Sequence, residues 1–166
     1  MAQSPTQNQR VYVQKEVVYG AIPNTAGAAT LANADAVLIS RCSLTPSSAT
    51  LMRPDKSPGY GNIVPTLGGD DDVKLPEASI DLAIMVDVYH ELAFPREVLA
   101  SIVRALRPGG RVVFVEYRAE DPRVPIKALH KMSEAQVRRE AGASGLVWER
   151  TAGGLPWQHA VIFRKR

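Results

Sequence analysis

The sequence predicts an α/β fold built on a mainly parallel sheet. Two buried-strand patterns, residues 80–89 and 111–118, flank a helical pattern at residues 95–107, and such alternation of strand and helix is typical of parallel sheets. Two more strand patterns, at residues 146–153 and 159–166, follow one another without a helix between them. They predict a C-terminal antiparallel hairpin at one edge of the sheet.

The central part of the chain carries the strongest patterns. Residues 80–89 (IDLAIMVDVY) are almost continuously apolar, as in a strand that is buried on both faces of a sheet. Residues 95–107 repeat apolar side chains at helical spacing and end at Pro-Gly-Gly, residues 108–110. A second helix is predicted at residues 133–144, with Ser133 as its N-cap.

The first third of the chain has weaker patterns. Residues 11–19 and 35–40 read as strands, and residues 24–34 are rich in small side chains and read as a short helix. A Pro-, Ser- and Gly-rich loop follows, and residues 62–68 form another predicted strand. We therefore expect a divergent N-terminal segment, residues 1–57, that is not an independent domain.

Composition limits the possible functions. The 166 residues fit one domain, and the net charge of +3 comes from scattered basic side chains, so a nucleic-acid partner is not expected. No apolar run approaches the ~20 residues of a membrane helix, and the polar N-terminus does not read as a signal peptide. Cys42 is the only cysteine, which excludes an internal disulfide. These features predict a cytoplasmic protein without a membrane partner.

Residues 58–166 resemble the C-terminal part of class I S-adenosylmethionine-dependent methyltransferases, in particular a bacterial group that acts on small molecules. The segments that carry the resemblance are GDDDVKLPEASIDLAIMVDVYHEL, LRPGGRVVFVEYRAEDP, PIKALHKMS and LPWQHAVIF. The resemblance implies a Rossmann-like, seven-stranded sheet with S-adenosylmethionine lying across the carboxyl ends of its strands. It also implies a transferase with a small-molecule methyl acceptor.

The resemblance also assigns cofactor-binding residues. Asp71, four residues before Leu75-Pro76, matches the acid that accepts a hydrogen bond from the adenine amino group, and the backbone at Ile63 matches the wall against which adenine packs. Asp87 and Val88 match the segment that faces the methionine part of the cofactor. Read without the family, the three acids at residues 70–72 are equally typical of a solvated turn.

Four polar residues are the candidates for catalysis: Asp87, Tyr89, His90 and Glu116 are expected to lie nearest the acceptor. His90 and Glu91 could act as a general base or a polar clamp. The alternative for His90 is a hydrogen-bonded structural histidine. No metal site is expected, because the chain has neither His-x-x-x-His nor His-x-His spacing.

One half of the cofactor site is not found in the sequence. The family has a glycine-rich loop after its first strand, whose glycines let the backbone approach the cofactor, and an acid after its second strand. The counterpart of the first strand, residues 35–40, continues into RCSLTPSS without a glycine, and no strand ending in an acid follows it. We therefore expect a truncated or degenerate methyltransferase with an incomplete sheet and impaired cofactor binding.

The missing first strand would leave residues 82–89 as an apolar, unpaired sheet edge. Either residues 36–40 or 11–19 pair with this edge, or two chains pair edge to edge as a homodimer. Two other functions stay open: a non-catalytic dimeric scaffold or binding module, and, as a minor alternative, a hydrolase that uses His, Asp and Ser groups. No Gly-x-Ser-x-Gly motif supports the hydrolase.

Overall fold

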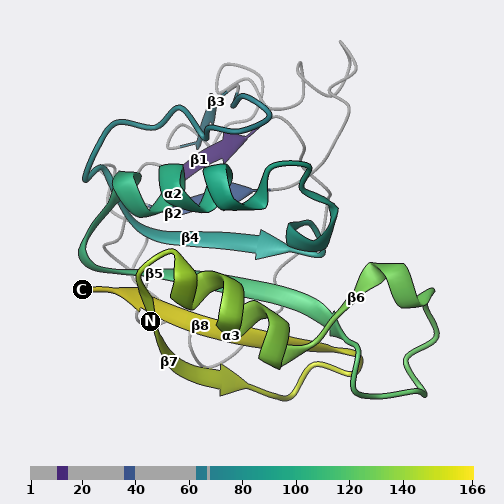
Figure 1. The fold of residues 1–166 in the computed structure, drawn as a ribbon. Coiled ribbons are helices and arrows are strands. Elements are labelled where there is room, and N and C mark those ends of the chain that lie inside the picture. Colours follow the sequence, from purple (N-terminus) through teal and green to yellow (C-terminus); the bar gives the residue numbers. More distant parts are fainter. Residues whose placement is uncertain (1–10, 15–35, 40–62, 67) are drawn as a thin grey trace, which may run out of the picture.

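A computed structural model describes residues 11–14, 36–39, 63–66 and 68–166 of the chain. In the first three ranges it describes the backbone only. Within these residues the strands form a single eight-stranded sheet. Figure 1 shows the sheet with α2 and α3 lying in front of it.

The first half of the sheet is parallel. It contains β1 (Val11–Gln14), β2 (Ala36–Ile39), β3 (Ile63–Thr66) and β4 (Ile80–Val86). β1 pairs with both β2 and β3, and β2 pairs with β4, all in parallel. The complete path through the sheet is β3-β1-β2-β4-β5-β8-β7.

The second half contains the helices and the antiparallel strands. Its elements are a 3₁₀ turn (Tyr89–Glu91), α2 (Pro95–Ala105), β5 (Leu106–Arg118), a 3₁₀ turn (Ala128–His130), β6 (Lys131–Met132), α3 (Glu134–Ala143), β7 (Leu146–Ala152) and β8 (Gln158–Lys165). β5 is parallel to β4 and antiparallel to β8, and β7 and β8 form the expected antiparallel hairpin at the edge. The prediction of a Rossmann-like α/β fold is confirmed.

The order of the first strands explains how β4 is paired. A doubly wound sheet usually has the order 3-2-1-4-5, whereas here β1 and β2 have exchanged positions. β2 therefore occupies the position beside β4, with Val37 opposite Ala83. This is the first of the two arrangements expected from the sequence, and it satisfies the backbone groups of a buried strand within one chain.

The expectation of an incomplete sheet is wrong in its strand number. All seven positions along the main path are occupied, although β1, β2 and β3 are only four residues each. Because β4 is paired on both sides, it offers no open edge to a second chain. The unpaired edge is therefore no longer an argument for a homodimer. The homodimer itself stays a prediction.

Two predicted boundaries differ from the structure for local reasons. The strand predicted at residues 80–89 ends at Val86, because Asp87 has a left-handed backbone with φ of 49°. The helix predicted at residues 95–107 ends at Ala105, because Leu106 is extended and already pairs with Ile80. The predicted helix at residues 24–34 lies outside the described residues.

The helix predicted at residues 133–144 is confirmed as α3. The side chain of Ser133 accepts a hydrogen bond from the backbone N–H of Gln136 at 3.2 Å, which satisfies one of the open donors of the first turn. Gly145 follows the helix with φ of 83°, a conformation that glycine adopts at little cost.

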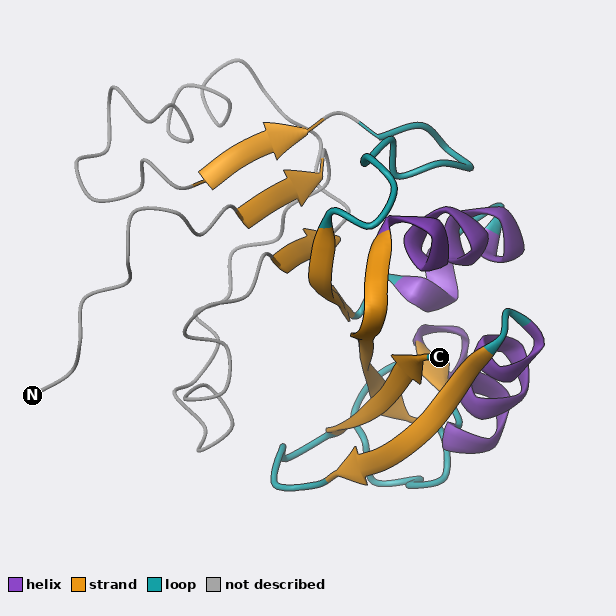
Figure 2. Cartoon of the chain, turned by 90° about the vertical axis from the view of Figure 1, so that its left-hand side faces the viewer, coloured by secondary structure: helices purple, strands orange, loops and turns teal. Residues whose placement is uncertain are grey.

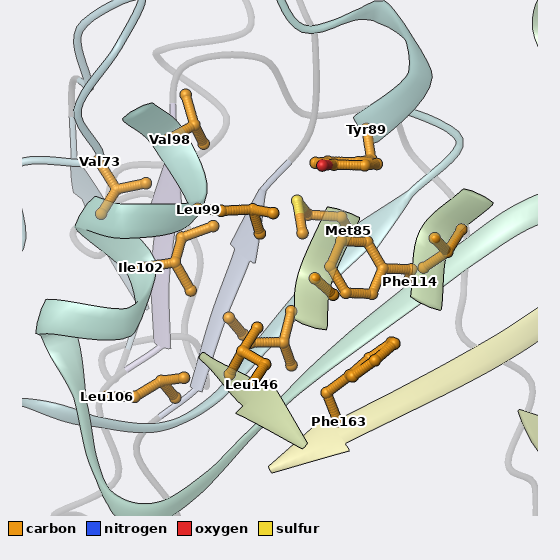
Figure 3. Packing of buried hydrophobic residues seen from close by; sticks show 14 of the residues in the cluster. Val73, Met85, Tyr89, Val98, Leu99, Ile102, Leu106, Phe114, Leu146 and Phe163 are labelled. Atoms are coloured by element: carbon orange, nitrogen blue, oxygen red, sulfur yellow. The ribbon is translucent and has the colours of Figure 1, made fainter. Parts of the chain in front are cut away.

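The core lies between the sheet and the two helices, which cover the same face (Figures 1 and 2). Residues opposite one another in the sheet form apolar rows on that face, such as Met85, Phe114 and Val161. The Phe114 ring packs edge-on against Tyr89 and Phe163, with centroids 4.9 and 5.6 Å apart. Figure 3 shows Met85 and Tyr89 beside Phe114, with Phe163 beneath the Phe114 ring in this view. None of the described helices is long and apolar enough to cross a membrane.

Phe114 is the residue whose truncation should damage the core most clearly. It is fully buried, so Phe114→Ala should lower the free energy of unfolding by about 3–5 kcal/mol, measured by denaturant titration. Leu129, which is 70% exposed, provides the apolar control, and Leu129→Ala should change it by less than about 0.5 kcal/mol. Equal losses in both variants would contradict this description of the core.

Candidate functional site

Three polar residues lie side by side at the carboxyl end of β4 and β5. Asp87 directly follows β4, and its backbone N–H donates to the carbonyl of Val115 at 2.8 Å. Glu116 is the next residue of β5, and His159 of β8 is paired with it. Ligands of open α/β sheets bind at this edge, so these residues mark the candidate site.

Glu116 is the centre of this group. Its side chain is fully buried, and its Oε1 accepts a hydrogen bond from the backbone N–H of Tyr89 at 2.9 Å. Its Oε2 lies 2.5 Å from Nδ1 of His90. Burial raises the pKa of Glu116, while the hydrogen bond with His90 acts in the opposite direction. The carboxyl group therefore ties β5 to the 3₁₀ turn after β4.

This contact favours one tautomer of His90. A carboxylate beside Nδ1 favours the tautomer with the proton on Nδ1, which leaves a lone pair on Nε2. The His90 side chain is only 7% exposed, and Nε2 has no hydrogen-bond partner among the described residues. Among the described residues Nε2 therefore lacks the hydrogen bond of a fully satisfied structural histidine, and the role of His90 stays a prediction. Such a nitrogen can accept a proton or bind a metal ion.

Tyr89 has a structural position. Its side chain is 3% exposed, and its hydroxyl donates to Oε2 of Glu140 in α3 at 2.9 Å. Burial, followed by the hydrogen bond to Glu140, raises the pKa of Tyr89. The catalytic role of Tyr89 stays a prediction, and its backbone N–H donates to Glu116.

Asp87 and Val88 differ although they are neighbours. Val88 is 1% exposed and packs in the core, so only its backbone can face a cofactor. The Asp87 carboxyl accepts a hydrogen bond from Gln158 through Oδ2 at 3.4 Å, and its Oδ1 is buried without a partner among the described residues. Burial raises the pKa of Asp87, and a nearby cation would offset that cost.

The three acids after β3 also have different environments. Asp72 binds Nη2 of Arg104 at 2.9 Å and the backbone N–H of Lys74 at 2.6 Å, which gives it a structural role. Asp70 and Asp71 are exposed, so Asp71 is accessible to a ligand. Ile63 lies in β3, with only its backbone described. No hydrogen bond or ion pair among the described residues joins Asp71 to Glu116 or His90.

The structure joins His130 to the pair of His90 and Glu91 that the sequence already singled out. Oε1 of Glu91 lies 3.8 Å from Nε2 of His90 and 3.5 Å from Nδ1 of His130. The His90 and His130 rings are 5.6 Å apart and nearly perpendicular. The His-x-x-x-His and His-x-His spacings do not detect this cluster, because the two histidines are 40 residues apart in the chain. The only signal for His130 was its place in the segment PIKALHKMS.

His159 completes the row as a buried, neutral histidine. Its side chain is 5% exposed and its Nε2 has no partner among the described residues. Burial lowers the pKa of His159; Glu120 and Glu134 act in the opposite direction, and Arg118 adds to the lowering. Unlike His90, His159 has no hydrogen bond to a carboxylate among the described residues.

Comparison with known proteins identifies the fold and the family. A family model described as a methyltransferase domain matches residues 27–114, more than half of the chain. The chain therefore belongs to the class I S-adenosylmethionine-dependent methyltransferases. The match begins upstream of residue 58 and includes β2. The expected division of the chain into a divergent segment, residues 1–57, and a methyltransferase-like part, residues 58–166, stays a prediction.

Solved structures show the same fold. An S-adenosylmethionine-dependent methyltransferase from Aquifex aeolicus aligns with a TM-score of 0.69 and 14% identity, over 95% of this chain and 82% of that one. A second, from Mesorhizobium loti, gives 0.63 and 16% over 94% and 90%. PigF, solved with S-adenosylhomocysteine (SAH), gives 0.66 and 16% over 95% and 50%. A search of curated protein sequences finds no match.

The lowered pKa of His159 predicts a loss of stability in mild acid. The unfolded chain binds a proton at about pH 6.5 and the folded chain only at lower pH, so stability falls as the pH decreases through that range. Between about pH 7.5 and about pH 5.5, His159→Gln should lose less free energy of unfolding than the unchanged protein. Denaturant titrations at both pH values measure this difference.

The control for this prediction is His130→Gln, since the His130 side chain is 35% exposed. This variant should retain the decrease of the unchanged protein. An identical decrease in the His159→Gln variant would show that another group is responsible.

Proposed function

We propose that this protein transfers a methyl group from S-adenosylmethionine to a small-molecule acceptor and holds the cofactor weakly. The observation that carries the proposal is Oδ1 of Asp87 at the carboxyl end of β4, which is buried and has no partner among the described residues. Asp87 follows the strand beside which the order of the sheet reverses, between β2 and β4. In open α/β sheets, ligands bind in the crevice at that point.

The described residues fit a cationic cofactor. A buried carboxyl oxygen without a partner is costly, and a positively charged ligand group beside Asp87 would compensate for it. Asp71 would hold the adenine amino group, with the Ile63 backbone beside the ring. When bound, the cofactor supplies a methyl group on a positively charged sulfur atom. The protein's own contribution is to position the acceptor and exclude water.

The sequence after β2 supports weak cofactor binding. β2 stands in the position of the family's first strand, beside β4, and residues 40–58 that follow contain no glycine. Backbone donors then lack the close approach that glycine allows. Charge-assisted hydrogen bonds contribute about 1.5–3 kcal/mol each, so the loss of two of them weakens binding by two orders of magnitude or more.

Enclosure at the acceptor side supports a small molecule. Glu116 is fully buried and the His90 side chain is 7% exposed. Because Nε2 of His90 is also buried, a bulky acceptor would not reach it. The hydrolase alternative has less support, because no hydrogen bond joins a histidine to a serine within the described residues.

Cofactor affinity is the direct test. Isothermal titration calorimetry with S-adenosylhomocysteine should give one site with a Kd of about 100 µM or weaker, which is about −5.5 kcal/mol. A submicromolar Kd would show that another element replaces the glycine loop. No heat up to millimolar ligand would favour the non-catalytic scaffold instead.

The two exposed acids after β3 provide a matched pair of variants. Asp71→Asn should weaken binding of S-adenosylhomocysteine about tenfold, because one charge-assisted hydrogen bond becomes a neutral one. Asp70→Asn, one residue away and also exposed, should change the Kd by less than about twofold. Equal effects of both substitutions would contradict the role of Asp71 and point to a general electrostatic effect.

A further inference from the structure

His90, Glu91 and His130 form a cluster with the geometry of a metal site. Each offers one ligand atom, and these atoms all lie within 4.8 Å of one another. His90 and Glu91 come from the 3₁₀ turn after β4, and His130 ends the 3₁₀ turn before β6. The cluster therefore joins two segments at the carboxyl edge of the sheet.

The burial and hydrogen bonding of His90 distinguish this cluster from polar side chains that meet on the surface by chance. Its Nε2 is buried and has no hydrogen-bond partner among the described residues, although a buried polar atom is normally satisfied. Its Nδ1 is held by Glu116 at 2.5 Å. Histidines that bind metals usually have this arrangement, with a carboxylate on the second ring nitrogen.

Glu91 lies between the two histidines. Its Oε1 is 3.8 Å from Nε2 of His90 and 3.5 Å from Nδ1 of His130. Ligands at 2.0–2.1 Å around a tetrahedral ion are about 3.4 Å apart, so only small movements are needed. The Glu91 and His130 side chains are 31% and 35% exposed, whereas the His90 side chain is 7% exposed and is held by Glu116.

We propose that His90, Glu91 and His130 bind a divalent transition-metal ion such as zinc, with Glu116 as a positioning residue. Two imidazole nitrogens and one carboxylate suit zinc or cobalt, whereas magnesium and calcium prefer oxygen ligands alone. The site departs from the expectation, based on sequence, that the chain has no metal. It was missed because its histidines are distant in sequence.

Three protein ligands leave a fourth position for water or for a ligand atom of a small molecule. An ion there would lower the pKa of a bound hydroxyl or thiol. The cluster and Asp87 lie at the same edge of the sheet, so the bound hydroxyl or thiol could belong to the methyl acceptor. That step rests on the proposed function. Metal binding itself does not depend on methyl transfer.

The test is a cobalt titration of the full chain without an affinity tag. It uses a Cys42→Ser background, so that the thiol cannot bind the ion, and no cofactor. One equivalent of Co²⁺ should give the visible absorption of a tetrahedral site, with a Kd below about 10 µM. Zn²⁺ should displace it stoichiometrically.

Two variants of exposed ligands should weaken cobalt binding by at least about thirtyfold: His130→Gln and Glu91→Gln. One control outside the cluster should leave it unchanged: Glu97→Gln at the exposed start of α2. Glu116→Gln should weaken binding about tenfold or more and alter the cobalt spectrum. Circular dichroism before titration confirms that each variant is folded.

Either of two results would overturn the proposal. The first is a Kd weaker than about 1 mM for both ions. The second is that the His130→Gln and Glu91→Gln variants bind cobalt as tightly as the unchanged protein. In the first case Nε2 of His90 is left to act as a general base. Since the titration contains no cofactor, a failure of methyl transfer has no effect on its outcome.

Discussion

The buried carboxyl group of Glu116 is the interaction on which the carboxyl edge depends. One oxygen accepts the backbone N–H of Tyr89 and the other contacts His90, so the turn after β4 is fixed to β5. Removing a carboxyl group from water is costly unless its oxygens are hydrogen-bonded. Both oxygens are bonded here, and the orientation of His90, the position of Glu91 and the course of the chain toward α2 all follow from it.

The second feature that shapes the molecule is the exchange of β1 and β2. A buried central strand needs partners on both sides, and β4 receives β2 where a doubly wound sheet has its first strand. The family fold is thus retained with a different order of strands. The half that contains α2, β5, α3 and the terminal hairpin keeps the usual arrangement, and that half also supplies the Glu116 group.

Much of the fold could be predicted from the sequence because its second half has clear periodicity. The buried runs of β4 and β5, the apolar face of α2 and the Ser133 cap each reflect local chemistry. The strand order could not be predicted, since AVLI and VYVQ are short apolar runs that fit several positions. For the site, Asp87, His90 and Glu116 were found through the family resemblance. His130 could not be joined to His90, because only the path from β5 to β6 brings it there.

The left-handed backbone at Asp87 has a consequence for attempts to improve the protein. A non-glycine residue with φ of 49° is strained by about 1 kcal/mol, and its buried carboxyl group adds to the cost. Glycine at this position would relieve both penalties at once. Selection for thermal stability alone would therefore favour loss of the Asp87 carboxyl group, and with it the proposed contact to a positively charged ligand.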